Sequence, residues 1–196
     1  MRWILFNSKK TTQLAALFLW KSGGNFTMPY IKLMNMLYFT EKEGMLRYGY
    51  SITGDEIFSM PHGPVLSHTY NMITDGSNES VWNDWISGED DYCVALKPKD
   101  ITANNYEDKF DLLSKAEVLL VDEIYNKYKH LSKWQIRDIT HDPKVCPEWH
   151  DPHGSSKPIT IDDIFLSNHR TQEEANSVKK QISENDSYSR LSKDLV

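Results

Sequence analysis

The feature that most constrains the fold is a helix-start signal that occurs three times in the second half of the chain. Each time, a Ser or Thr is followed three positions later by Glu, Gln or Asp, and apolar residues flank the pair. The first side chain accepts a hydrogen bond from the backbone of the first turn, the later one reciprocates, and the flanking residues clamp that turn. The three pairs are Ser114 and Glu117, Ser132 and Gln135, and Thr160 and Asp163. The sequence therefore predicts helices that begin after residues 114, 132 and 160.

Apolar spacing predicts two further helices nearer the N-terminus. Residues 14–20 place Leu and Phe at helical spacing, and Gly23 and Gly24 then end the pattern. A second helix is predicted over about residues 28–45, with Pro29 in its first turn. Because several of its faces are apolar, this helix is expected to lie at the centre of the domain.

Turn residues between these helices predict small β-hairpins and one more helix. A Gly-Asp pair between short β-prone runs predicts a hairpin over residues 49–60, and a Gly-Glu-Asp-Asp run predicts a second within residues 81–98. Gly63 and Pro64 predict the start of a third helix, with Pro64 at its first position. Together these patterns predict an α+β fold that is predominantly α-helical, a compact helical domain with one or two small β-hairpins.

The length and composition fit one globular domain with a polar appendage. The chain has 196 residues, of which 39% are hydrophobic, and its six Trp, ten Tyr and seven Phe exceed what a disordered chain carries. The domain is expected over residues 1–168. Residues 169–196 are a polar C-terminal extension, predicted to form one amphipathic helix and then to be flexible.

Charge and hydropathy argue against two classes of partner. No apolar stretch reaches the roughly 18 residues that span a bilayer, so no membrane association is expected. The net charge of −6 argues against direct binding of nucleic acid, which needs an excess of Lys and Arg on one face. Without a visible export signal, Cys93 and Cys146 are expected to be reduced thiols and the protein to be cytoplasmic.

One loop gathers residues of the types that bind zinc. His141, Cys146, His150 and His153 lie within thirteen residues. Their spacing matches neither paired Cys-x-x-Cys knuckles nor His-Glu-x-x-His on a helix. The simpler interpretation is a solvated loop in which one His anchors the preceding helix. No bound metal is therefore expected, and a metal site built from these four residues stays an alternative.

No pattern in the sequence predicts catalysis. Ser67, His68 and Cys93 have suitable neighbours, but neither a nucleophile elbow nor a Cys-His signature is present. The glycine-rich loops that bind nucleotides are also absent from the sequence. We therefore expect no catalytic residue and no cofactor.

The acidic charge is concentrated in one segment. Residues 84–111 hold eight acidic and three basic residues, a net charge of −5. The segment is either a solvated hairpin tip or a surface complementary to a basic protein. In the second case Asp90 and Asp91 would attract the partner, and Trp82 and Trp85 would anchor it.

Three runs of residues, in this order and at these separations, resemble the Panacea domain, also called the SocA-like antitoxin domain. They are Lys32–Phe39, Phe58–Val65 followed by Tyr70, and Leu131–His141 with Trp149 downstream. The resemblance covers roughly residues 10–168, and the Gly63-Pro64-Val65 element is its most specific part. The motif residues are Leu33, Leu37, Tyr38, His62, Gly63, Pro64, Val65, Tyr70, Trp134, His141 and Trp149. They are expected to be mainly structural, with His62 alone facing a partner.

The resemblance implies a protein that neutralises a toxin by binding it, as the antitoxin of a bacterial or phage toxin–antitoxin pair. One branch of the family instead acts as a proteolytic adaptor that delivers its toxin to the ClpXP protease. Three functions therefore stay open: an antitoxin that binds a cognate toxin, an adaptor for a ClpXP-type protease, and a metal-dependent enzyme that uses the 141–153 loop.

Overall fold

The computed structural model describes residues 6–74, 80–89, 91–97 and 99–193 of the chain. The helices are α1 (Ser8–Lys21), α2 (Tyr30–Tyr48), α3 (Ser67–Thr74), α4 (Ser80–Trp85), α5 (Tyr106–Lys109), α6 (Lys115–Tyr128), α7 (Lys133–Thr140), α8 (Ile161–Ser167) and α9 (Gln172–Lys193). The strands are β1 (Thr27–Pro29), β2 (Ile57–Met60), β3 (Gly63–Leu66), β4 (Ile86–Glu89), β5 (Cys93–Leu96) and β6 (Lys157–Ile159). The predicted α+β, predominantly helical fold is confirmed.

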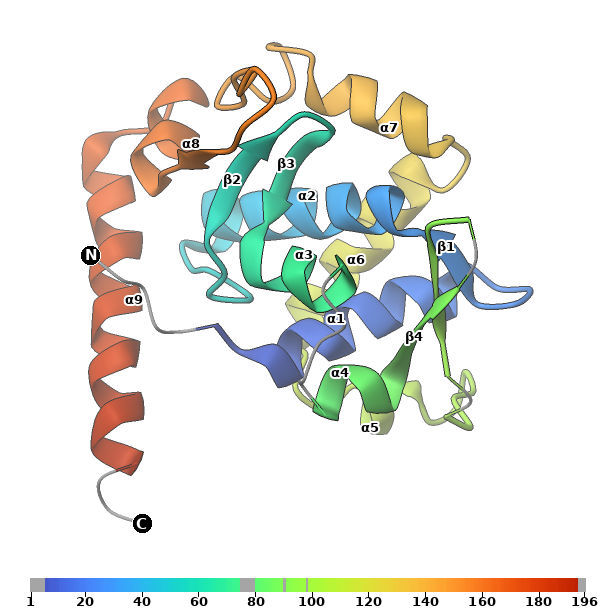
Figure 1. Cartoon of the computed structure of the whole chain (residues 1–196). Helices are drawn as coiled ribbons and strands as arrows, with labels where there is room; N and C mark the ends of the chain where they lie inside the picture. The colour runs from blue at the N-terminus through green and yellow to red at the C-terminus, as the bar shows by residue number, and fades with distance from the viewer. Residues whose placement is uncertain (1–5, 75–79, 90, 98, 194–196) are drawn as a thin grey trace.

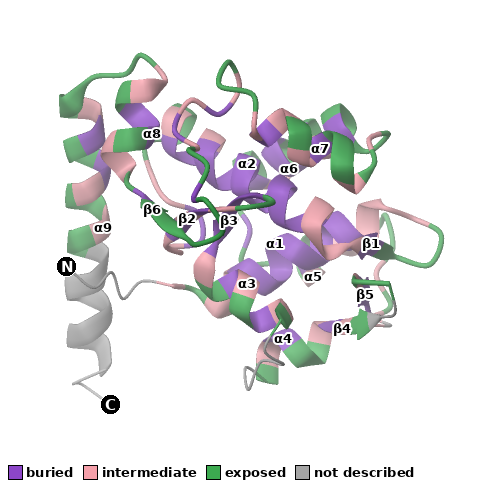
Figure 2. Ribbon diagram, turned by 45° about the horizontal axis from the view of Figure 1, so that its top comes forward, coloured by how far each residue is buried: buried purple, intermediate pink, exposed green. Residues whose placement is uncertain are grey.

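Helices α1 and α2 form the centre of the core. Residues 14–19 of α1 are all fully buried, as are Leu33, Leu37 and Tyr38 of α2. Figure 1 shows α2 running through the middle of the domain, and Figure 2 shows the buried residues concentrated on these two helices. The central position predicted for the second helix is therefore confirmed. Gly49, with φ of +73°, ends it.

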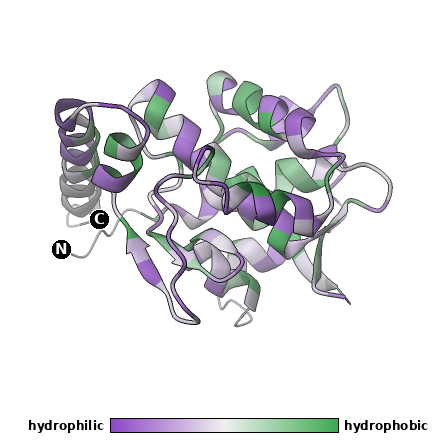
Figure 3. Cartoon of the chain, turned by 90° about the horizontal axis from the view of Figure 1, so that it is seen from above, coloured by the Kyte–Doolittle hydropathy of each residue, from purple (hydrophilic) through white to green (hydrophobic). Residues whose placement is uncertain are grey.

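All three helix-start signals are confirmed. In α6, α7 and α8 the capping side chain accepts from the backbone N–H three positions on, and the later side chain accepts from the backbone N–H of the capping residue. Each signal works because it needs only local geometry. Figure 3 shows much of the hydrophobic colour on the helices in the middle of the domain.

The strands form two small antiparallel sheets of three strands each, in the orders β1-β5-β4 and β3-β2-β6. The hairpin predicted over residues 49–60 is wrong, because its Gly-Asp pair lies in the loop before β2. That loop is held by buried carboxylates: Glu41 accepts hydrogen bonds from Thr53 N and Oγ1 at 2.9 Å each, and Asp55 accepts from Thr69 N at 2.9 Å. The hairpin is instead β2–β3.

The helix start predicted at Gly63 and Pro64 is also wrong. Residues 63–66 form strand β3, and α3 begins only at Ser67. Because β3 is an edge strand, Pro64 can occupy it without removing a hydrogen bond from the interior of the sheet. Asp55 supplies the acceptors that cap α3 from outside the helix, through His68 N and Thr69 N.

The hairpin predicted within residues 81–98 is confirmed only in its second part, as β4 and β5. The first part, with Trp82 and Trp85, is helical and forms α4. The Trp-x-x-Trp spacing places both rings on one face of a helical turn, but the β-prone composition of the segment led to the prediction of a strand.

Helix α9 accounts for most of the polar C-terminal extension and stands along one edge of the domain (Figure 1). Its first half packs against α8 through Ala175 and Val178, which are both buried. Lys179 Nζ adds an ion pair with Asp162 at 2.7 Å. No helix in the described part of the chain is both long and apolar enough to cross a membrane.

Candidate partner-binding site

The turn of the β2–β3 hairpin packs against α2 and α7 at Gly63. This glycine has φ of +108°, and a Cβ placed on it would lie 2.5 Å from Thr140 Oγ1 and 2.8 Å from Asn35 Oδ1. Both the backbone conformation and the space therefore require glycine. Pro64 and Val65 follow it in β3 and are buried. This contact sets the position of His62, which is exposed at the tip of the turn.

His141 and Trp149 fix the loop after α7 against the same hairpin. Their rings stack with centroids 3.9 Å apart and an angle of 10° between planes. Trp149 Nε1 donates to the carbonyl of Met60 at 3.2 Å. His141 is also the C-cap of α7, where its backbone N–H donates to the carbonyls of the last turn. Its Nε2 is buried and has no hydrogen-bond partner among the described residues.

The stability of the domain is expected to depend on the protonation of His141. Burial and the nearby Arg137 guanidinium lower the pKa of His141 below its ordinary value. The unfolded chain therefore takes up a proton more readily, and stability is lost as the pH falls from about 6.5 through the lower folded pKa. In urea denaturation, the parent should lose more free energy of unfolding between pH 7.5 and 5.5 than His141→Phe, which keeps the ring stack. An equal loss in both proteins would contradict this role.

A buried polar network ties the same loop to α2. Lys42 Nζ lies 2.8 and 3.0 Å from the two carboxylate oxygens of Glu148 and donates to the carbonyl of Val145 at 2.9 Å. Tyr38 and Asn168 also donate to Glu148. The side chains of Lys42 and Glu148 are only 4% and 0% exposed, so the pair is shielded from solvent. Its role is therefore to hold the loop.

The structure does not bring the four alternative metal ligands together. Cys146 is buried beside Tyr38, and burial raises the pKa of its thiol to about 12, which disfavours the thiolate that binds metal. His141 is stacked on Trp149, whereas His150 and His153 are exposed. Across the described ranges, no group of three or more His, Cys, Asp or Glu residues is placed to hold a metal ion.

A cavity of about 510 Å³ opens beside the β2–β3 turn. Its floor is made by three buried residues, Met34, Asn35 and Val65, and its rim includes Tyr30 and His62. The remaining lining residues are Ile31, Met60, Pro61, Tyr70, Gly154, Ser155 and Ser156. Four separate segments of the chain therefore meet at this cavity.

Two exposed aromatic side chains lie next to residues that line the cavity. The Tyr30 ring lies 6.2 Å from that of Tyr92, which is 74% exposed at the tip of the β4–β5 hairpin. The His62 ring lies 6.0 Å from that of Trp134, which is 45% exposed on α7. Exposed aromatic residues around a cavity are typical of protein-binding surfaces.

The residues predicted to anchor a partner near the acidic segment differ in exposure. Trp82 is 3% exposed and belongs to the core, so it offers no surface to a partner. Trp85 is half-buried, with Lys99 Nζ 5.1 Å from its ring centre and Phe110 beside it. Asp91 is exposed next to Tyr92, and Asp90 lies outside the described residues.

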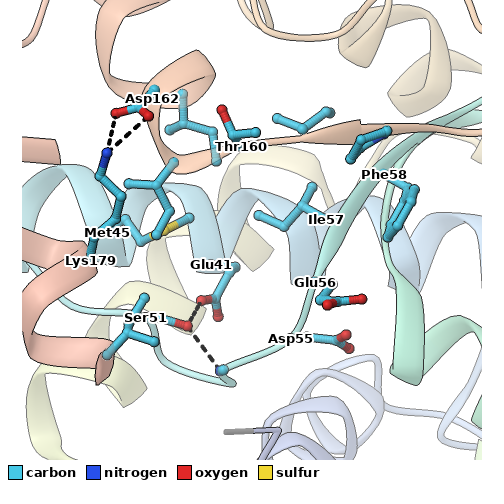
Figure 4. A pocket seen from close by; sticks show the side chains of 16 residues that line it. Glu41, Met45, Ser51, Asp55, Glu56, Ile57, Phe58, Thr160, Asp162 and Lys179 are labelled. Atoms are coloured by element: carbon cyan, nitrogen blue, oxygen red, sulfur yellow. Dashed lines mark hydrogen bonds and ion pairs between the residues drawn. The ribbon is translucent and has the colours of Figure 1, made fainter. Parts of the chain in front are cut away.

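A second cavity, of about 360 Å³, lies between the β3-β2-β6 sheet, α8 and α9 (Figure 4). Two of its carboxylates have partners: Ser51 donates to Glu41, and Lys179 pairs with Asp162 (Figure 4). Burial raises the pKa of Glu41, and the hydrogen bonds from Ser51 and Thr53 oppose that shift. Glu41 and Asp162 therefore support the fold.

Of the residues that line the 510 Å³ cavity, the sequence singled out only His62, Val65 and Tyr70. Asn35 and Tyr30 are among those that it missed. Asn35 is a single amide within the apolar run from Leu33 to Phe39, and a polar residue in such a run is a signal of a buried polar contact. Nothing local singles out Tyr30, because its neighbour Tyr92 is far along the chain.

The fold defines a predominantly helical α+β domain with an aromatic-rimmed cavity beside a fixed hairpin turn. The family model "Antitoxin SocA-like, Panacea domain" matches residues 33–150, more than half of the chain. The chain therefore belongs to the SocA-like, Panacea domain family. The match begins within α2 and ends just after Trp149, so it includes the hairpin turn and the Lys42–Glu148 pair but neither Asn168 nor α9. Comparisons with curated proteins and with solved structures gave no significant match.

Proposed function

We propose that this protein is the antitoxin of a toxin–antitoxin pair and neutralises a cognate toxin by binding it directly. The observation that carries the proposal is the antitoxin-family match over residues 33–150. The exposed aromatic residues Tyr92 and Trp134, which lie next to the cavity residues Tyr30 and His62, support a role in binding another protein. The protein acts in the cytoplasm, with no membrane or nucleic acid as a partner.

The surroundings of the reactive side chains support a role without catalysis. Glu41 and Asp55 hold loops and helix ends, Glu148 is bound to Lys42, and Cys146 is buried with a raised pKa. Catalytic groups need access to a substrate and a pKa suited to proton transfer or attack. The absence of catalysis would be overturned if the pure protein hydrolysed a nucleotide, peptide or ester and lost that activity when His141 or His150 was changed.

The acidic segment is proposed to speed association with a basic toxin. The exposed carboxylates of Asp91 and Asp108 act through a field that salt screens, with a Debye length of about 8 Å at 0.15 M. The double variant Asp91→Lys/Asp108→Lys should therefore associate several-fold more slowly at low salt and nearly normally at 0.15 M. The double variant Glu173→Lys/Glu184→Lys, at two exposed positions on α9, makes the same change in net charge and is the control for charge alone. If the association rate of the Asp91→Lys/Asp108→Lys variant at low salt equals that of the parent, the acidic segment is only a solvated hairpin and takes no part in association.

Co-expression with the adjacent reading frame tests the proposal. That product should stop growth of a bacterial host when expressed alone, and this chain should restore growth and co-purify with the product. The same test in a host without ClpXP separates the alternatives. Restored growth there supports neutralisation by binding, whereas rescue only in the presence of ClpXP would identify a proteolytic adaptor. No rescue in either host would contradict both functions.

A further inference from the structure

The 510 Å³ cavity beside the β2–β3 turn contains a hydrogen-bond donor that is not used within the described part of the chain. Asn35 is 1% exposed, lines the cavity, and its Nδ2 has no hydrogen-bond partner there. A buried amide without a partner is unfavourable, so a group that accepts from it on binding removes that cost. The floor of the cavity therefore favours an oxygen acceptor.

The wall of the cavity supplies further donors and no acidic side chain. Tyr30 and Ile31 belong to the first turn of α2. The Tyr30 N–H already donates to the Tyr92 carbonyl at 2.9 Å, whereas Pro29, the N-cap, gives the next N–H groups no side-chain acceptor. The first N–H groups of a helix have no intrahelical partner, which again favours an acceptor nearby. Two independent features of the same cavity therefore point to one kind of ligand atom.

The remaining lining fixes the rest of the ligand's chemistry. No Lys, Arg, Asp or Glu lines the cavity, so a phosphate or another charged group would lose its hydration without a counter-charge. The side chains of Ile31, Met34 and Val65 offer an apolar surface instead. The ligand is therefore uncharged, with an apolar body and a carbonyl-type oxygen. A peptide segment meets both requirements, because an apolar side chain supplies the body and the main-chain carbonyl supplies the oxygen.

We propose that this cavity is the anchor site for the toxin, and that it takes an uncharged apolar side chain of a toxin segment while Asn35 Nδ2 donates to that segment's main-chain carbonyl. This inference rests on the proposed function. A lining that is uncharged and offers hydrogen-bond donors favours a segment of this kind over a charged ligand. Trp134, held between Lys133 and Arg137 at 5.2 and 5.0 Å, then packs on the part of the toxin that leaves the cavity past His62.

The test uses the full chain and the purified product of the adjacent reading frame as the probe, with affinity measured by calorimetry. Ser156→Trp adds a bulky side chain at an exposed lining position and should weaken binding about 30-fold or more. Ser177→Trp, an exposed position on α9, is the matched control and should change affinity less than about twofold. Asn35→Leu, which removes the donor and keeps the volume, should weaken binding about fivefold. Thermal melting of each variant checks that the domain is folded.

Each outcome decides a separate point. If the parent binds the product and Ser156→Trp binds it with the same affinity, the anchor site is wrong and the proposed function stands. No binding by the parent would overturn the proposed function and the anchor site together. A small molecule that co-purifies with the parent, seen by native mass spectrometry and lost in Ser156→Trp, would show that the cavity holds a metabolite rather than a toxin segment and would also overturn the inference.

Discussion

Glu148→Ala is expected to lower the free energy of unfolding by about 3–5 kcal/mol, the typical cost of leaving a buried charge without its partner. In this variant the Lys42 ammonium, whose side chain is 4% exposed, would keep only the Val145 carbonyl as a described hydrogen-bond acceptor. The hydroxyl of Tyr38 and the amide of Asn168 would lose Glu148 as well. Urea denaturation at pH 7.5 measures the change.

The control removes both charges at once. Replacing a buried pair by apolar residues of similar volume is often close to neutral, because the desolvation cost disappears with the charges. Lys42→Met/Glu148→Leu should therefore be more stable than Glu148→Ala alone. If the single variant were as stable as the parent, the pair would not hold the 141–150 loop against α2.

Gly63→Ala is expected to lower the free energy of unfolding by about 2–5 kcal/mol. Strain at φ of +108° contributes about 1–3 kcal/mol, and forcing Thr140 and Asn35 away from the new Cβ adds a comparable overpacking cost. The hairpin turn should also move away from α7, because Thr140 lies there, and toxin binding should weaken with it. Chemical denaturation and the binding assay report the two effects.

Gly24→Ala is the matched control, because Gly24 also has a positive φ, of +54°, but has nothing within 4 Å of its Cβ position. It should cost only about 1 kcal/mol and leave binding unchanged. Equal losses in the two variants would show that Gly63 is required for its backbone angle and not for its close contact with α2 and α7.

Local signals predicted most of the helices and failed where the outcome depends on the sheets. A capping pair needs only residues three positions apart, so all three predicted starts are correct. Gly63 and Pro64 are equally compatible with a helix start and an edge strand, and the pairing of β2 with β3 decides between them. Likewise, the Gly-Asp pair before β2 lies in a loop, because Glu41, on α2, accepts hydrogen bonds from the backbone N–H groups of Ile52 and Thr53 just before the pair.

The candidate site was predicted in part. His62 and Trp134 were recognised from the family motifs, and the structure brings their rings within 6.0 Å. The buried pair of Lys42 and Glu148 joins residues 106 positions apart, a separation that no local pattern reports. The cavity needs four segments to meet, so its volume and lining follow only from the packed fold.

The central claim is that this chain inhibits its toxin by binding alone. The most direct test is a purified assay that contains the product of the adjacent reading frame, proposed as the toxin, together with that product's target and increasing amounts of this chain, with no protease present. The account predicts that toxin activity falls to zero near one equivalent of this chain, and that Ser156→Trp needs a large excess to reach the same inhibition. Full toxin activity in the presence of excess parent chain would contradict neutralisation by direct binding.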